Sequence, residues 1–504
     1  MNSAKSTYLR SSAVISVIAA LLAALAIAQT PANAKLPETP AGKTFGAFLV
    51  AFNSGNLETM RRFHSDHGGN VDNAEQDMEF YNQSGGLVLH SAKASGEFEI
   101  EALVQTKKDG NWLNFTMRVE SSAPYPPTAI QAQPAEAPRD APKNDAGAAK
   151  PPEAAAAPAR RLSEAEVTQS LTAFLEERAK DDRFSGVVLL AREGKPFFVK
   201  AYGLADKAKN LPNNPQTKFN LGSMNKMFTA VAIAQLAEQG KLSFDDKVSK
   251  FLPDYPNKDV ANKVTIHHLL THTSGLGSYW NAKFDARRAQ IKTVADYLAL
   301  FADEPLLFEP GARFEYSNSG FIVLGAIVEK VSGQSYYDYV RKHIYEPAGM
   351  KNTDAYQMTE ETPNLAMGYT NMGPNDRPAS GPRRPNTETR PNRGGPAGGG
   401  YSTVEDLLRF ATALREHKLL SAKMTEFITT GKVSMGPGKY GYGFGDMQVN
   451  GQRFIGHNGG APGIGSDLSI FPELGYVAVV MTNYDPPLMM PVARRARELL
   501  TQGH

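Results

Sequence analysis

Residues 219–226 read Phe-Asn-Leu-Gly-Ser-Met-Asn-Lys, and a nearly continuous apolar run follows them from Met227 to Ala237. The run is long enough for a buried helix, which we expect to end at Gly240. Ser223 then stands at the start of that helix, where free backbone N–H groups favour developing negative charge. Lys226 lies one turn later on the same face, and a desolvated lysine there can accept the serine proton. The alternative is a helix-capping serine followed by a surface lysine, which the apolar character of the helix disfavours.

A second segment, Tyr316-Ser317-Asn318, precedes another apolar helix predicted from Phe321 to Val331. A tyrosine hydroxyl beside a lysine ammonium can be pushed toward phenolate and act as a general base. The Asn318 amide can bind Lys226 and a substrate carbonyl. The alternative is a loop tyrosine that packs on the start of a helix.

A third segment, His457-Asn458-Gly459-Gly460, follows a predicted short strand, Phe454 to Gly456, and precedes a Gly-rich turn and another strand. Glycine at a strand edge lets a substrate lie against the backbone. The N–H group that follows it can face an oxyanion. The alternative is a plain hairpin turn.

Together the three segments resemble the serine β-lactamase and penicillin-binding superfamily, whose Ser-x-x-Lys, Tyr-x-Asn and Lys/His-x-Gly elements line one cleft. Three further phrases are similar to the usual wording of that family: Leu269 to Leu276, Tyr345 to Met350 and Ala397 to Thr403. The resemblance covers about residues 165 to 500. It is closest to the class C-like branch, which includes class C β-lactamases, D-alanyl-D-alanine carboxypeptidases, D-aminopeptidases and carboxylesterases.

The resemblance implies a role for each matching position. Ser223 is the acylated nucleophile, and Lys226 and Tyr316 share the removal of its proton and the activation of the deacylating water. Asn318 orients the substrate amide or Lys226. Ser223 and Gly460 donate backbone N–H groups to the oxyanion hole.

His457 departs from the pattern of class C β-lactamases, which carry lysine at this place. Histidine is typical of peptidase and esterase relatives, so this residue counts against efficient β-lactam hydrolysis. A substrate carboxylate would also meet less fixed positive charge at neutral pH. The predicted substrate and oxyanion residues are Asn318, His457, Gly459 and Gly460.

The composition agrees with an enzyme of several domains. The 504 residues are 41% hydrophobic and 21% charged, which is enough for two or three folded cores. A formal net charge of +2 argues against a nucleic-acid partner. The absence of cysteine excludes disulfides, thiolate metal sites and a cysteine nucleophile.

Histidines give no convincing metal site, and we expect neither a metal nor a cofactor. His64 and His67 lie one turn apart, but no carboxylate stands at matching spacing on a second element, so we expect surface histidines. His267, His268 and His272 lie within or beside the Leu269 phrase, where the resemblance requires no metal.

Residues 1–34 have the features of a signal peptide. Lys5 and Arg10 precede an apolar run from Ala13 to Ala28, and Ala32-Asn33-Ala34 is a small-x-small cleavage site. An uncleaved membrane anchor is the alternative, although the run is short for a span. We therefore expect a periplasmic or secreted protein with no stable membrane span after cleavage.

Residues 134–161 are rich in alanine and proline and lack hydrophobic periodicity, which predicts a linker. The preceding domain, 35–133, has helical spacing first and alternating strands later. This order resembles the NTF2-like cone fold, a small α+β domain for which a homodimer is plausible. The strands predicted there are Leu87 to His90, Phe98 to Gln105 and Trp112 to Val119.

Residues 162–504 have predicted strands near both ends, inside a first and a last helix, around a long, mostly helical middle. This arrangement predicts an α+β fold with one antiparallel sheet completed by distant segments, flanked by helices, and a helical lobe beside it. The site is expected in the cleft between the sheet and the lobe. This is also the fold that the β-lactamase-like resemblance implies.

The segment Asn371 to Gly400 carries five arginines and many prolines and glycines. Its composition favours a solvated loop. A basic flap that attracts anionic substrates is the alternative. The arginines are Arg377, Arg383, Arg384, Arg390 and Arg393.

These observations predict an exported serine hydrolase that cleaves small esters or D-amino-acid amides and peptides through a Ser223 acyl-enzyme. The partner is a small ester or peptide substrate, such as one derived from the cell wall. A β-lactamase or D,D-carboxypeptidase is the alternative among enzymes. A non-catalytic cell-wall or ligand-binding protein with this fold is the alternative of another class.

Overall fold

The computed structural model of the chain describes residues 35–69, 71, 73–135, 137–138, 160–372, 382–436 and 438–504. They fall into two compact units, one within Met1–Pro151 and the other within Pro152–His504. The predicted signal peptide and most of the predicted linker lie outside the described residues. Within the described ranges, no helix is long and apolar enough to cross a membrane.

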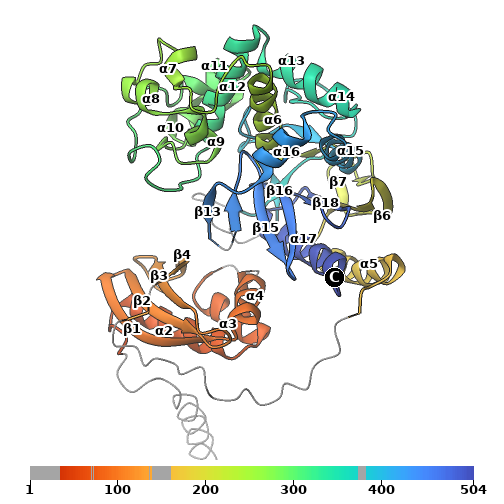
Figure 1. The fold of residues 1–504 in the computed structure, drawn as a ribbon. Helices are drawn as coiled ribbons and strands as arrows, with labels where there is room; N and C mark the ends of the chain where they lie inside the picture. The colour runs from red at the N-terminus through yellow and green to blue at the C-terminus, as the bar shows by residue number, and fades with distance from the viewer. Residues whose placement is uncertain are drawn as a thin grey trace, which may run out of the picture. The chain divides into compact units, whose positions relative to one another are not determined.

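The N-terminal unit is a small α+β structure with three helices packed against a four-stranded antiparallel sheet, in the order β1-β2-β3-β4 (Figure 1). Asn56 caps the second helix, because its side chain accepts a hydrogen bond from the Thr59 N–H (3.0 Å). Phenylalanine rings dominate the core. The elements are α2 (Pro40–Asn53), α3 (Leu57–Asp66), α4 (Asn73–Ser84), β1 (Leu87–Gly96), β2 (Glu99–Thr106), β3 (Trp112–Val119) and β4 (Pro127–Pro134).

Two features of this unit differ from the sequence expectations. Strand β4 was not predicted, because its alanines and terminal prolines resemble the linker that follows, yet it pairs with β3 along its length. His64 is buried rather than exposed, and its Nε2 lies 2.6 Å from the Asp77 carboxylate on α4. The partner escaped notice because it belongs to a different helix.

The C-terminal unit is built on one eight-stranded antiparallel sheet in the order β13-β14-β15-β16-β17-β18-β5-β6. The early strand β5 lies between the late strand β18 and β6, so distant segments complete the sheet as predicted. The strands are β5 (Gly186–Arg192), β6 (Lys195–Tyr202), β13 (Val433–Met435), β14 (Gly438–Tyr440), β15 (Gly445–Val449), β16 (Gln452–Ala461), β17 (Ile464–Phe471) and β18 (Tyr476–Thr482).

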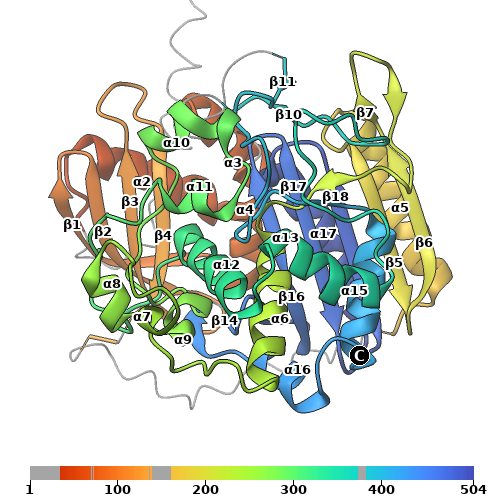
Figure 2. The same cartoon turned by 90° about the horizontal axis from the view of Figure 1, so that it is seen from above.

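Helices cover both faces of this sheet, and the sequence of β5 shows why. Its alternate residues Val187 and Leu189 belong to one core, while Val188 and Leu190 belong to the other. Helices α5 (Glu164–Lys180) and α17 (Pro486–Thr501) pack on one face, and α15 (Val404–Arg415) packs on the opposite face (Figure 2).

The helical lobe surrounds α6 and α12, two almost wholly buried helices that contact each other. Three two-stranded ribbons complete the unit. The helices are α6 (Asn225–Glu238), α7 (Val248–Phe251), α8 (Lys258–Lys263), α9 (Ile266–Leu270), α10 (Ala282–Arg287), α11 (Val294–Leu298), α12 (Asn318–Ser332), α13 (Tyr336–Val340), α14 (Glu346–Ala348) and α16 (Ala422–Thr429), with short turns η1 (Gly222–Met224), η2 (Arg288–Gln290) and η3 (Arg341–Tyr345). The ribbons pair β7 (Leu204–Asp206) with β8 (Leu211–Pro212), β9 (Phe219–Asn220) with β12 (Tyr401–Ser402), and β10 (Tyr369–Thr370) with β11 (Arg384–Pro385).

One strand corrects the sequence interpretation near the site. The expected short strand, Phe454 to Gly456, is the middle of β16, which continues through His457 and both glycines to Ala461. Glycine weakens an isolated strand, but here β17 holds these residues in a regular ladder, with Gly459 opposite Ser466 and Gly460 opposite Gly465.

Candidate active site

Ser223 lies in the single turn η1, directly before α6, and is partly exposed. The preceding Gly222 has a positive φ of 48°. A Cβ atom there would lie only 2.8 Å from the backbone nitrogen of Gly460. Glycine at position 222 therefore allows both the left-handed turn and the close approach of β16 to the serine.

Lys226 is completely buried at the start of α6. Its Nζ donates hydrogen bonds to Asn318 Oδ1 (2.7 Å) and to the carbonyl oxygen of Ala397 (2.6 Å). Burial lowers the pKa of this amine well below its ordinary value of 10.5. A neutral amine has two N–H groups, so these two acceptors satisfy both and leave the lone pair available.

Tyr316 lies between these two residues and α12. The Lys226 Nζ is 4.8 Å from the centre of its ring. Removal from water raises the pKa of the Tyr316 hydroxyl, although the residue is 41% exposed, and a hydrogen bond with Ser223 opposes the rise. The direction is opposite to the expected shift toward phenolate, because removal from water disfavours the charged phenolate. Lys226 is therefore better suited than Tyr316 to be the base in the free protein.

Strand β16 presents an open backbone edge to the serine. Its neighbour β15 ends opposite Gly456, so β16 has no strand partner on that side beyond this point. The freed edge lies against η1. A Cβ atom at Gly459 would stand 2.0 Å from the carbonyl oxygen of Leu221. The two backbones can meet only because the strand carries glycine here.

His457 is buried in β16. It is 7% exposed and, like Tyr316 and Lys226, is not among the described residues that line the cavity. Its Nδ1–H donates to the Asn458 carbonyl, and its Nε2 accepts from the Tyr440 hydroxyl (2.9 Å). Burial, with the nearby Lys226, lowers its pKa to about 3, so the ring is neutral at pH 7.

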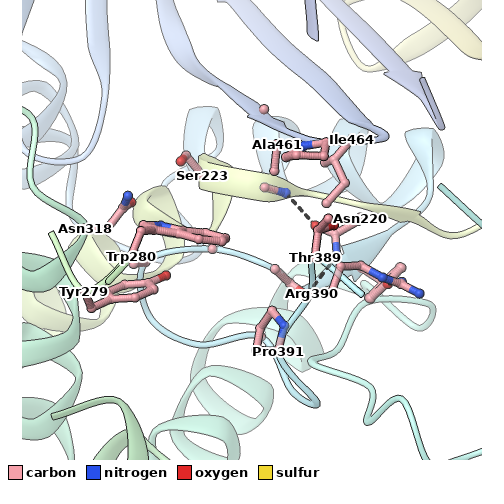
Figure 3. Close-up of a pocket in the computed structure, with 18 of the residues that line it drawn as sticks. Asn220, Ser223, Tyr279, Trp280, Asn318, Thr389, Arg390, Pro391, Ala461 and Ile464 are labelled. Atoms are coloured by element: carbon pink, nitrogen blue, oxygen red, sulfur yellow. Dashed lines mark hydrogen bonds between the residues drawn. The ribbon is translucent and has the colours of Figure 1, made fainter. Parts of the chain in front are cut away.

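A cavity of about 530 Å³ opens in front of Ser223, and its lining includes Asn318 and Gly460. Tyr279 and Trp280 lie on one side, and Thr389, Arg390 and Pro391 lie on the other (Figure 3). Most of the lining is apolar or aromatic. Among the described lining residues, the only formally charged side chain is Arg390.

In the described parts of the basic segment, 371–372 and 382–400, several arginines have fixed partners rather than the free exposure of a solvated loop. Arg390 is 7% exposed and donates to the Tyr401 hydroxyl. Arg393 donates to the Ala355 carbonyl, and Arg383 forms an ion pair with Asp182. These arginines have fixed partners, which corrects the prediction from composition. Arg377 lies outside the described residues.

Sequence reasoning missed several residues around the serine. His272 stacks on Tyr316, and the Asn225 side chain accepts from the Gly400 N–H (3.0 Å). His272 belongs to the Leu269–Leu276 phrase, and Asn225 contacts Gly400 in the Ala397–Thr403 phrase. Both phrases were used only for their similarity to the family. The Tyr279-Trp280 pair follows the Leu269–Leu276 phrase after two residues, and two adjacent aromatic residues there were the available signal.

Among the described residues, no group of three or more His, Asp or Glu side chains is placed to hold a metal ion. His267, one of the three neighbouring histidines, instead hydrogen-bonds the Tyr442 hydroxyl (2.7 Å).

The sequence profile of the Beta-lactamase family matches residues 171–502, which contain every element of this site. The chain belongs to the Beta-lactamase family. Penicillin-binding protein 4* of Bacillus subtilis (strain 168) is 32% identical over 307 residues, covering 58% of this chain and 66% of that protein. The match spans between 42% and 66% of the length of the curated relatives.

Solved structures agree with the family assignment. A penicillin binding protein from Bacillus halodurans is 34% identical, with a TM-score of 0.57 over 64% of this chain and 98% of that one. A D-stereospecific amidohydrolase from Streptomyces sp. is 25% identical, with a TM-score of 0.57 over 68% of this chain and 100% of that one. This Beta-lactamase family member therefore shares its antiparallel sheet and helical lobe with these two structures.

Proposed function

We propose that this protein is a serine hydrolase that transfers an acyl group from a small ester or a D-amino-acid amide or peptide to water. The observation that carries the proposal is the environment of Lys226. A fully buried amine, with both N–H groups bonded to carbonyl oxygens, adjoins a partly exposed serine at a cavity. Such an amine serves as a base at neutral pH.

In the proposed reaction, the Ser223 oxygen attacks the substrate carbonyl carbon while Lys226 and Tyr316 take up its proton. The N–H groups of Ser223 and Gly460 stabilise the oxyanion. The proton then passes to the leaving group as the old ester or amide bond breaks. Water attacks the resulting acyl-enzyme, and its proton returns through the same pair of residues to restore Ser223.

The cavity favours a substrate with an apolar or aromatic group. Tyr279 and Trp280 offer ring surfaces beside the serine, and the described lining has no carboxylate to repel a substrate acid. The names of the relatives, a penicillin-binding protein and a D-stereospecific amidohydrolase, fit an amide of a D-amino acid. We therefore favour aromatic or apolar acyl groups over small charged ones.

A β-lactamase or D,D-carboxypeptidase is the second candidate among enzymes. The neutral, inward-facing His457 provides no fixed positive charge at the cavity wall, which counts against tight binding of a β-lactam carboxylate. Arg390 supplies the remaining charge there.

Export is part of the proposal because of the basic, apolar and small-residue segments in residues 1–34. The proposed location is the periplasm or the outside of the cell.

The decisive experiment compares the wild type with Ser223→Ala on p-nitrophenyl butyrate, a D-phenylalanine amide, nitrocefin and a D-alanyl-D-alanine peptide, with intact mass recorded during turnover. We expect an acyl adduct and turnover for the wild type and neither for Ser223→Ala. Ser278→Ala is the matched control, because this serine also lines the cavity, and it should retain the adduct. No adduct and no turnover on any substrate would favour the non-catalytic binding protein.

A further inference from the structure

His272 has an unusual backbone in a fully buried position. It follows α9 directly, is 0% exposed and has a φ of +59°. This left-handed conformation is uncommon for residues with a side chain and often marks a functional constraint. The turn directs both its carbonyl group and its ring toward the segment that carries Tyr316.

The backbone on each side of Tyr316 is hydrogen-bonded to this one histidine. The Glu315 N–H donates to the His272 carbonyl oxygen (2.8 Å). The Ser317 N–H donates to His272 Nδ1 (3.0 Å). Tyr316 is therefore bracketed by two hydrogen bonds to the same residue.

The imidazole ring also contacts the tyrosine side chain. Its centre lies 4.2 Å from the centre of the Tyr316 ring, with the two planes 31° apart. Phe321 and Tyr440 surround the imidazole at 5.1 Å and 4.8 Å. Any movement of the Tyr316 ring would therefore break its contact with the imidazole.

The hydrogen-bond pattern fixes the protonation of His272. Because Nδ1 accepts a backbone N–H, the proton of the neutral ring must be on Nε2. Nε2 is buried and has no hydrogen-bond partner among the described residues. An apolar residue would avoid this unmet group, so the histidine is explained by its acceptor Nδ1 and not by packing alone.

We propose that His272 is a positioning residue that holds the Tyr316 hydroxyl at Ser223 for proton transfer. The proposal rests on the proposed function of the Ser223 site. Among the described residues, no hydrogen bond joins His272 to Ser223 itself, so His272 would act through Tyr316 and not on the substrate.

A double-mutant cycle on the full chain tests this, with p-nitrophenyl butyrate as the probe. Asparagine tolerates a left-handed backbone, so His272→Asn retains the bond to Glu315 but removes the ring. We expect kcat to fall about 100-fold with little change in KM. In a Tyr316→Phe background, the same substitution should have almost no further effect, since the hydroxyl that it positions is absent.

His272→Phe provides a second variant, because it keeps a ring but removes the Nδ1 acceptor, and we expect an intermediate loss of kcat. His267→Asn is the control, since His267 is close in sequence but bonds to Tyr442, and its kcat should equal that of the wild type. Losses from His272→Asn and Tyr316→Phe that simply multiply would overturn the proposal, because they would indicate a general structural effect.

A crystal structure of His272→Asn separates this inference from the proposed function. A displaced Tyr316 side chain in that structure supports the positioning role even if no substrate is turned over. A Tyr316 hydroxyl that stays in its wild-type position overturns it. Ser223-dependent turnover with an unchanged kcat for His272→Asn would overturn the inference while leaving the proposed function intact.

Discussion

At the scale of single residues, the buried amine of Lys226 links reactivity to stability. Water would stabilise its charged form, and the folded protein withholds that water. The unfolded chain therefore binds a proton at this amine more tightly than the folded chain does. A residue that serves as a base in this way makes folding less favourable than an apolar residue of the same shape would.

Lys226→Met tests this coupling through the pH dependence of unfolding. Because the folded-state pKa lies below 10.5, this lysine weakens the fold at low pH, and the weakening disappears as pH rises toward 10.5. The stability of the wild type relative to Lys226→Met should thus increase with pH, with a slope of at most about 1.4 kcal/mol per unit at pH values between the folded-state pKa and 10.5. Urea unfolding at pH 7, 8 and 9 measures the difference.

The exposed Lys241 at the end of α6 is the matched control, and Lys241→Met should show no such slope. Equal slopes for the two variants would mean that Lys226 keeps its charge in the folded protein. Turnover should be lost in Lys226→Met alone.

Residues within short motifs could be predicted from the sequence, but their distant partners could not. Ser223 and Lys226 are one helical turn apart, so their shared face follows from helix geometry alone. The hydrogen bond from Lys226 to the Ala397 carbonyl oxygen and the packing of the His272 ring against Tyr316 depend on tertiary structure. The reversed pKa shift of Tyr316 has the same origin, since desolvation is a property of the whole neighbourhood.

At the scale of elements, strand β16 forms the wall of the site with its backbone. The sequence predicted a short strand ending at Gly456, with a plain hairpin turn from His457 as the alternative to a glycine-bearing strand edge. The ladder with β17 overrides that local preference. The main sheet and the buried helices were predictable from their continuous apolar runs, whereas the short strands β13, β14 and β15 have no such runs.

Gly459→Ala tests the close contact between β16 and η1. The added methyl group would stand 2.0 Å from the Leu221 carbonyl oxygen, so one of the two backbones must move. We expect kcat to fall about 100-fold and Tm to decrease. Gly277→Ala is the control, because its nearest new contact is an ordinary 3.7 Å. Unchanged kcat in Gly459→Ala would show that this edge does not position the reacting groups.

At the scale of the whole molecule, the two units have separate hydrophobic cores. The phenylalanine-rich core of the N-terminal unit contains no residue of the C-terminal unit. The site and its supporting elements all belong to the latter. The NTF2-like resemblance and the homodimer stay predictions.

Residues 160–504 should therefore fold and act without the N-terminal unit. We expect this fragment to retain the kcat of the full chain on p-nitrophenyl butyrate and to melt in one transition. Kinetics and calorimetry on both proteins provide the comparison. A large loss of kcat in the fragment would instead assign the N-terminal unit a part in the reaction.

The pairing of β5 with β18 also constrains the order of events during synthesis. Gly186 and its ladder partner Thr482 leave the ribosome far apart in time, so β5 emerges with both apolar faces and one edge uncovered. Of its two neighbours in the sheet, β6 follows directly, but β18 is made only after the helical lobe has been translated. Such long-range pairing is slow and prone to aggregation. The nascent chain should accordingly depend on chaperones that hold it unfolded until the last strands are made.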